Sequence, residues 1–268
     1  MARPFMVVLW LTSLVSVLGT LVLIRAPAVT AMFGDALSWL IRVPTLVYLL
    51  ALPAIVWLVL RESVGVRRAV MMLVWGSAVG LAAELLGTTT GWPFGAYKYT
   101  EFLEPQFFGH VPVFIPLSWF AMSVVALWLA TTVTTRPVGR VVLAATAMVC
   151  WDLVLDPAMV VGWPVWIWSD PAGVYYGMPL INLIGWWVTS AGIMAGYLAI
   201  ERAPVVHHRW PRQLWLLSSV LPLGLALVRG LWPAVVIGGA GVAAPFLWSW
   251  LADRRAVRPL AEPEVVTS

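Results

Sequence analysis

The chain is short of charge. Only 10% of its 268 residues are Asp, Glu, Lys or Arg, whereas an ordinary soluble domain carries about 25%. Hydrophobic residues make up 62% of the chain, and the mean hydropathy is +0.92. This composition excludes a soluble globular enzyme and indicates an integral membrane protein. The 18 Trp gather near the ends of apolar runs, which is typical of indole rings at a membrane interface.

Cysteine and histidine are scarce as well. Cys150 is the single cysteine, so the chain cannot form an intrachain disulfide or a cysteine-ligated metal centre. His207 and His208 are adjacent, do not share a helix face, and leave His110 as the third histidine. We therefore predict no metal site. The 16 basic residues stand in ones to threes between apolar runs, which argues against a nucleic-acid partner.

Apolar runs, by contrast, fill most of the chain. A membrane span needs about 20 apolar residues, and eight runs approach or reach that length: residues 6–24, 43–60, 69–86, 111–133, 141–156, 180–200, 212–228 and 231–251. The sequence predicts an all-α fold, a polytopic transmembrane helix bundle of one domain over residues 1–252, with a polar cytoplasmic tail over 253–268. If the first run were a cleaved signal peptide, seven spans would remain. Its apolar stretch exceeds the roughly 7 to 15 residues of a signal-peptide core, which favours a retained helix.

The basic residues predict the orientation of these spans. Taken on alternate sides of the runs, one side receives four, namely Arg25, Arg42, Lys98 and Arg229, and the other receives 12, namely Arg3, Arg61, Arg67, Arg68, Arg136, Arg140, Arg202, Arg209, Arg212, Arg254, Arg255 and Arg258. The positive-inside rule then places both termini in the cytoplasm of a multi-pass protein of the cell's inner membrane. Loops 87–110 and 157–179 face outward. In the second loop, bulky residues flank the turn-forming residues 169–173, which predicts a small hairpin.

Three acidic residues lie inside apolar runs. An ionised side chain there costs at least about 2.5 kcal/mol, so each requires a partner or a purpose. Glu84 lies roughly 24 Å from the cytoplasmic end of its run, and Asp156 lies at the same depth on another run, at 1.5 Å per residue. Asp152 is one helical turn deeper on the same face as Asp156. Because Gly87 and Pro157 favour helix ends, we expect Glu84 and Asp156 near helix C-termini.

These positions favour acids that keep their protons. The C-terminal end of a helix carries negative partial charge, and neighbouring carboxyl groups repel each other's charge. A neutral carboxylic acid is a proton donor, which is what the chemistry of an apolar alkene requires. The acids could equally serve as structural hydrogen-bonding partners of neighbouring helices, and Asp156 could cap the hairpin loop.

Aromatic residues surround the acids in the sequence. Loop 87–110 holds Trp92, Phe94, Tyr97, Lys98 and Tyr99, and the spans are flanked by Trp151 and Trp186. Aromatic faces stabilise a cation by about 0.5 to 2 kcal/mol, although each ring could instead belong to an interfacial belt. Asn182, at the start of the sixth run, could hold a water or orient a carboxyl group, or could cap a helix.

Two stretches of the chain resemble a known family. Residues 84–87 (ELLG), 90–99 (TGWPFGAYKY), 111–112 (VP) and 115–119 (IPLSW) are similar to the CruF family of carotenoid hydratases, as are residues 151–157 (WDLVLDP), 175–179 (YYGMP) and 182–186 (NLIGW). The likeness covers about residues 80 to 200. The resemblance implies a multi-span membrane enzyme, of a family that includes bisanhydrobacterioruberin hydratases, which adds water to the terminal double bond of an acyclic carotenoid end group.

The implied reaction suggests a role for each candidate residue. Protonation of the alkene gives a tertiary cation, and water captures it as a tertiary alcohol without a cofactor. We assign the proton donor to Asp152 or Glu84 and water positioning to Asp156 with Asn182. Substrate binding and cation shielding fall to Tyr97, Tyr99, Trp151 and Trp186, with Trp92 and Lys98 at the site. The expected partners are a membrane-dissolved acyclic carotenoid, water, the lipid bilayer and other enzymes of the carotenoid pathway. A carotenoid cyclase and a non-enzymatic carotenoid carrier remain alternatives.

Overall fold

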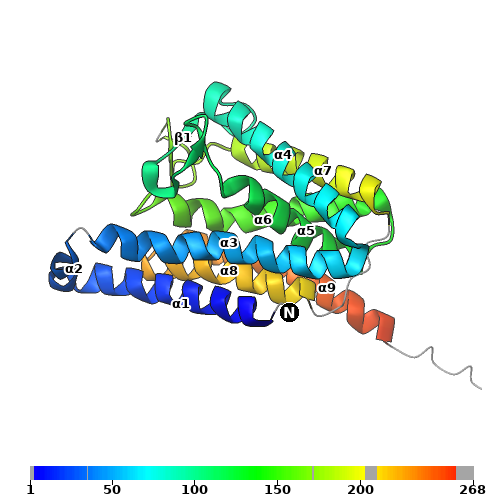
Figure 1. The fold of residues 1–268 in the computed structure, drawn as a ribbon, viewed down its shortest axis with the longest axis horizontal. Coiled ribbons are helices and arrows are strands. Elements are labelled where there is room, and N and C mark those ends of the chain that lie inside the picture. The colour runs from blue at the N-terminus through cyan, green and yellow to red at the C-terminus, as the bar shows by residue number, and fades with distance from the viewer. Residues whose placement is uncertain (1–2, 35, 171, 203–209, 258–268) are drawn as a thin grey trace, which may run out of the picture.

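The protein is a bundle of long helices with a small irregular cap at one end (Figure 1). A computed structural model describes residues 3–34, 36–170, 172–202 and 210–257. Within these residues the α-helices are α1 (Arg3–Arg25), α2 (Pro27–Phe33), α3 (Ala36–Val64), α4 (Val66–Thr90), α5 (Ile115–Val133), α6 (Pro137–Val160), α7 (Ile181–Ile200), α8 (Trp210–Val228) and α9 (Trp232–Val257). The connections between α4 and α5 and between α6 and α7 contain the strands β1 (Tyr97–Tyr99), β2 (Gln106–Phe107), β3 (Val111–Pro112) and β4 (Trp166–Trp168) and the short helix η1 (Glu101–Leu103).

Eight of the described helices, all but α2, are long and apolar enough to cross a membrane. This confirms the predicted multi-pass α-helical architecture. The first run forms α1, which packs against α3 and α8. The helices exceed several predicted runs, and the short helix α2 was not expected from the sequence. Helix α9 continues to Val257, so the predicted tail begins inside it, and residues 258–268 lie outside the described part of the chain.

Helix α5 forms the centre of the bundle. It contacts α3, α4, α6, α7, α8 and α9. Every residue from Trp119 to Ala130 is buried, so the helix is apolar on all sides rather than amphipathic, as a helix surrounded by other helices must be. Small residues such as Ala121 and Ala126 allow the neighbours to approach closely. The helices that carry the three acids, α4 and α6, both pack directly on α5.

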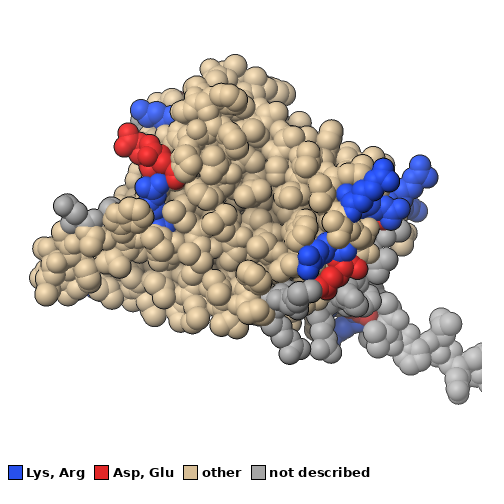
Figure 2. Space-filling model, viewed as in Figure 1, with Lys and Arg blue, Asp and Glu red and all other residues tan. Residues whose placement is uncertain are grey.

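The two ends of the bundle differ. The start of α1 and the end of α9 lie at one end, and the cap with β1 lies at the other (Figure 1). Charged side chains are confined to the two ends of the face seen in Figure 2, and the band between them carries none. This arrangement is that of a membrane-spanning body and agrees with an even number of spans. The assignment of the first end to the cytoplasm stays a prediction from the basic residues.

The cap joins the two long connections. Strand β4 does not fold back into the hairpin that residues 163–176 predict; instead it pairs with β1, antiparallel, with Tyr97 opposite Trp168 and Tyr99 opposite Trp166. Pro171, within the predicted turn, lies outside the described residues. The hairpin prediction is wrong because it considered one loop alone. Pairing with β1 supplies backbone hydrogen bonds to β4 and places its Trp side chains beside the Tyr side chains of the other loop.

The orientation can be tested with reporter fusions. Fusions after Arg61, at the end of α3, and after Gly173, in the connection before α7, should report opposite sides of the membrane, with Arg61 in the cytoplasm. A fusion after Arg136, between α5 and α6, serves as a second cytoplasmic control. If the Arg61 and Gly173 fusions report the same side, both the helix count and the common depth of the acids are wrong.

Candidate active site

The first acid, Glu84, lies in the C-terminal half of α4, toward the cap. The helix does not end at Gly87 as predicted but continues to Thr90, where Gly91 takes a left-handed conformation (φ +80°) and donates its N–H to the carbonyl of Gly87. The glycine at position 87 serves packing instead. A Cβ there would lie 2.8 Å from Phe94 Cδ2 and 3.0 Å from Tyr97 Cε1, so only a residue without a side chain lets the loop lie on the helix.

The other two acids lie on α6, which likewise passes its predicted end. Pro157 lacks an N–H and leaves the carbonyl of Leu153, four residues earlier, without its helical partner. The hydroxyl of Tyr175 donates to that carbonyl at 2.7 Å, so α6 continues through Pro157 to Val160. Burial raises the pKa of Tyr175 to about 12, which keeps it a donor at neutral pH. Asp156 therefore occupies an ordinary helical position one turn before the end of α6.

Glu84 is held by three donors. Its side chain is buried, and Oε2 accepts hydrogen bonds from the hydroxyls of Tyr97 and Tyr99, the latter at 2.9 Å. Oε1 accepts from Trp119 Nε1, on α5, at 2.8 Å. Burial, and next the charge of Glu84, raises the pKa of both tyrosines well above the usual value. The phenols thus stay protonated and can satisfy the carboxyl group that the bundle buries.

The aspartates are less completely bonded. Both are at most 1% exposed. Asp152 Oδ2 accepts from Asn182 Nδ2, on α7, at 2.8 Å, and Asp156 Oδ1 accepts from Trp166 Nε1, on β4, at 2.8 Å. The remaining oxygens, Asp152 Oδ1 and Asp156 Oδ2, have no hydrogen-bond partner among the described residues. Buried polar atoms without a partner are rare and costly, so these two oxygens are available to a proton, a water or a substrate.

The β1–β4 pair brings aromatic rings to the acids. Because side chains alternate along a strand, Tyr97 and Tyr99 face inward while Lys98, between them, is exposed, and Trp166 and Trp168 flank Ile167 in the same way. The rings pack against one another: Tyr97 lies 5.3 Å from Trp168, and Tyr99 lies 6.1 Å from Trp166, between centroids. The cap is therefore an aromatic lid over the acids.

Two neighbouring cavities adjoin the acids. The smaller, which we call the acid pocket, has a volume of about 30 Å³, enough for a water molecule, and its lining includes Glu84, Asp156 and Asn182. The larger, the aromatic cavity, has a volume of about 100 Å³, reaches between α3, α5 and α6, and is also lined by Glu84 and by Trp119, Trp151 and Trp186. Trp186 stacks on Trp119 with ring centroids 4.5 Å apart and lies 6.3 Å from Trp151.

Most residues that the sequence singled out meet at this site: Glu84, Asp152, Asp156, Tyr97, Tyr99, Trp151, Asn182 and Trp186. Two do not. Trp92 is 57% exposed on the outer surface, and Lys98 points away from the acids on β1. The site also includes Trp119, Trp166, Trp168 and Tyr175, to which the sequence alone assigned no role. Trp119 lies in one of the stretches that resemble the carotenoid hydratases, but nothing in the sequence shows that α5 brings this indole to Glu84.

The arrangement suits proton transfer in an apolar setting. Asp156, which has a free oxygen, lines a cavity whose other walls are mostly aromatic rings, which attract cations. No group of three or more His, Cys, Asp and Glu side chains suited to a metal ion occurs within the described residues, and His207 and His208 lie outside them. The fold and the site together define a multi-pass membrane protein with a buried site of three acids under an aromatic lid.

Comparison with known proteins names the family. The family of carotenoid biosynthesis proteins matches residues 44–245, so the chain belongs to it. A bisanhydrobacterioruberin hydratase from Haloarcula japonica is 35% identical over 144 residues, which cover 51% of this chain and 47% of that protein. The chain thus matches about half the length of this curated relative. No solved structure matches the chain.

The bond between Tyr175 and Leu153 should contribute to stability. In Tyr175→Phe, the Leu153 carbonyl would be buried without a donor, which costs about 1–3 kcal/mol of the free energy of unfolding. We expect a lower midpoint of thermal unfolding in detergent. Tyr176→Phe removes the same hydroxyl from the neighbouring ring, 5.0 Å away, and is the matched control. Equal midpoints for the two variants would show that α6 does not depend on this bond.

Proposed function

We propose that the protein is a carotenoid hydratase, which adds water to the terminal double bond of an acyclic carotenoid and gives a tertiary alcohol. The observation that carries the proposal is the acid pocket, a water-sized space that is lined by Glu84 and Asp156 and has mostly aromatic walls. Membership of the family and the name of the Haloarcula relative support the substrate class. The aromatic cavity, which Glu84 also lines, would hold the alkene end.

The two aspartates are the proposed source of the proton. They lie one turn apart on the same face of α6, and two neighbouring carboxyl groups in an apolar site hold a proton between them more readily than two charges. Asp156 lines the acid pocket and has a free Oδ2, whereas Asp152 lies one turn deeper and is joined to the pocket through Asn182. Asp156 therefore presents the proton, with Asp152 behind it.

Glu84 takes a different part. Because three donors already occupy its oxygens and stabilise its charged form, it is the acid least suited to carry a proton to the substrate. It lines both cavities, so its negative charge would lie beside the carbon that becomes positive. Sequence reasoning offered Asp152 or Glu84 as the donor and gave water positioning to Asp156. In our proposal Glu84, Trp151 and Trp186 stabilise the cation instead.

The reaction then balances without a cofactor. A carboxyl proton from the aspartate pair forms the new C–H bond at the less substituted alkene carbon, and the tertiary carbon becomes a cation. A water in the acid pocket attacks this carbon, and its extra proton returns to the aspartate pair. The enzyme regains its starting state, and the substrate has gained one water with no net change of oxidation level.

The direct test is expression in a lycopene-producing bacterium, followed by analysis of the pigments. The wild type should produce a tertiary alcohol heavier than lycopene by one water. Asp156→Asn should lower turnover by about 100-fold or more, because general acids contribute 10²–10⁴-fold, while the protein still inserts and accumulates. Asp170→Asn makes the same chemical change at an exposed loop position and should leave turnover intact. Ring-closed products would identify a cyclase, and unchanged lycopene bound to the protein would identify a carrier.

Isotopic labels test the mechanism separately. With membranes in heavy water, one deuterium should appear on the carbon next to the carbinol, since the proton comes from an exchangeable acid. With ¹⁸O-labelled water, the hydroxyl oxygen should carry the label. The reaction should proceed without oxygen or nicotinamide and in the presence of chelators. If the hydroxyl oxygen came from molecular oxygen, the protein would be a hydroxylase and the proposed addition of water would be wrong.

A further inference from the structure

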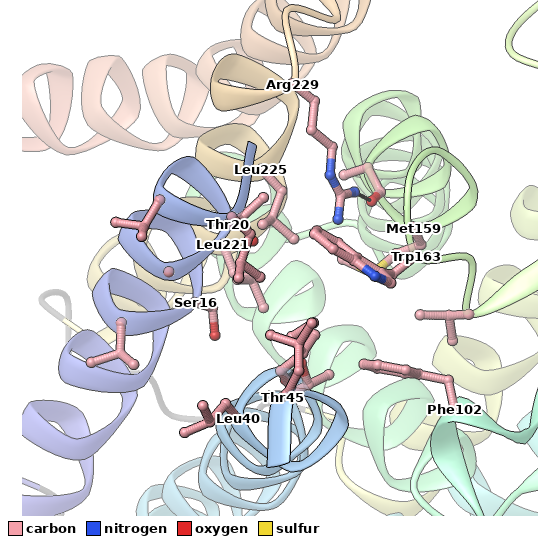
Figure 3. A pocket seen from close by; sticks show the side chains of 18 of the residues that line it. Ser16, Thr20, Leu40, Thr45, Phe102, Met159, Trp163, Leu221, Leu225 and Arg229 are labelled. Atoms are coloured by element: carbon pink, nitrogen blue, oxygen red, sulfur yellow. Dashed lines mark hydrogen bonds between the residues drawn. The ribbon is translucent and has the colours of Figure 1, made fainter. Parts of the chain in front are cut away.

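A third cavity, larger than the two at the acids, lies beside the first turns of α3. We call it the α1 chamber; its volume is about 290 Å³. Figure 3 shows it between α1, which contributes Ser16 and Thr20, α3, with Leu40 and Thr45, and α8, with Leu221. Apart from a few hydroxyl groups and one arginine, its lining is apolar. None of the residues that we have placed in the chemical step lines it.

The arginine belongs to the wall of the α1 chamber. Arg229 donates to the carbonyl of Ala158, in the last turn of α6, and its guanidinium lies 5.8 Å from the centre of the Trp163 ring. A cation at the C-terminal end of a helix is favoured by the helix dipole. Burial lowers the pKa of Arg229 to about 10, so the side chain stays charged at neutral pH. It caps α6, and with Trp163 it closes one side of the chamber (Figure 3).

The α1 chamber adjoins the aromatic cavity. Four residues line both the chamber and the aromatic cavity: Thr45, Met159, Val165 and Leu221. The aromatic cavity in turn shares Glu84, Tyr99, Trp166 and Trp186 with the acid pocket. The three cavities therefore adjoin one another in order, from the acid pocket through the aromatic cavity to the α1 chamber.

The far side of the series faces the region of the lipid. Val15 on α1 and Leu40 on α3 line the chamber and are 56% and 52% exposed. Both are apolar and both lie in membrane-spanning helices. A long apolar molecule dissolved in the bilayer would meet the chamber from this side without crossing water.

We infer that the α1 chamber binds the unreacted part of the substrate's polyene chain while one end of the chain lies at the acids. The inference rests on the proposed function for the identity of the substrate. The aromatic cavity alone, at about 100 Å³, is far smaller than the roughly 300–1,000 Å³ of pockets that enclose ligands of drug size, so a long chain must continue beyond it. The α1 chamber borders this cavity at the four shared residues and is the space into which we infer that the chain extends.

Gly19 allows a sharp test. It lines the chamber, and a Cβ added to it would have no heavy atom of the described residues within 4 Å. A larger side chain at this position should therefore fill the chamber without shifting α1. Gly192, on α7, also has space for a Cβ but does not line the chamber. Gly19→Phe and Gly192→Phe are thus matched variants, and Gly19→Ala is an intermediate step.

Two substrates distinguish an effect of a substitution on the chamber from an effect on the chemical step. Lycopene has the full polyene chain, and citronellol has a terminal alkene of the same substitution on a short chain. We expect Gly19→Phe to lower kcat/KM for lycopene about tenfold or more, the usual scale of an overfilled site, and to leave hydration of citronellol within about twofold of the wild type. Gly192→Phe should resemble the wild type with both. Unchanged lycopene turnover in Gly19→Phe, or equal losses in both variants, would overturn the inference.

A binding measurement keeps the inference testable even if the protein hydrates nothing. When each variant is purified from lycopene-producing cells, Gly19→Phe should retain less lycopene per protein than the wild type and Gly192→Phe. Equal retention by all three proteins would overturn the inference. So would the loss of a phospholipid from Gly19→Phe with lycopene unchanged, since the chamber would then be a lipid site. Absence of hydration by the wild type would refute the proposed function alone.

Discussion

The structure depends on how three carboxyl groups are kept inside an apolar bundle. Each is buried, and the donors that satisfy them come from elsewhere in the chain: Tyr97 and Tyr99 from a loop, Trp119 from α5, Trp166 from the other loop and Asn182 from α7. All five donor groups are neutral, so they stabilise the acids without supplying a countercharge. A salt bridge at the same place would fix the acids as anions and end their use in proton transfer. The aromatic lid, the position of α5 and the packing of α7 all follow from this requirement.

The spans and most of the site could be predicted from the sequence. Long apolar runs and the costs of burying charge are local properties, and they identified eight spans and Glu84, Asp152 and Asp156 as the residues to explain. The wrong predictions concern positions whose structure depends on contacts with distant segments of the chain. Pro157 and Gly87 are good helix breakers by themselves, but Tyr175 supplies the bond that Pro157 removes, and Phe94 and Tyr97 need the space at Gly87. Likewise β4 pairs with β1, which lies in a different loop of the chain and cannot be identified from the residues around β4.

The roles of the aromatic residues also depend on contacts between distant segments. Eighteen Trp in a membrane protein are mostly explained by the interface, and composition cannot separate those that line a site from those that face lipid. Trp92 and Trp119 both lie in the region that resembles the carotenoid hydratases, yet Trp92 is 57% exposed and Trp119 is 4% exposed. Only the packing of α4 against α5 makes Trp119 a partner of Glu84. Burial and contact, rather than residue type, divide the two classes.

The pairing of β1 with β4 has a consequence for biosynthesis. The strands are separated in the chain by two complete membrane spans, α5 and α6. During synthesis, Glu84 is made before its donors on β1 and α5, Asp156 before Trp166 on β4, and Asp152 before Asn182 on α7. The growing chain must therefore carry incompletely bonded acids through the insertion of several helices. The bond to Asp152 closes only when α7 has been made, so a chain truncated before α7 would leave this carboxyl group without its donor inside the membrane and give the cell's quality control a marker of incompleteness.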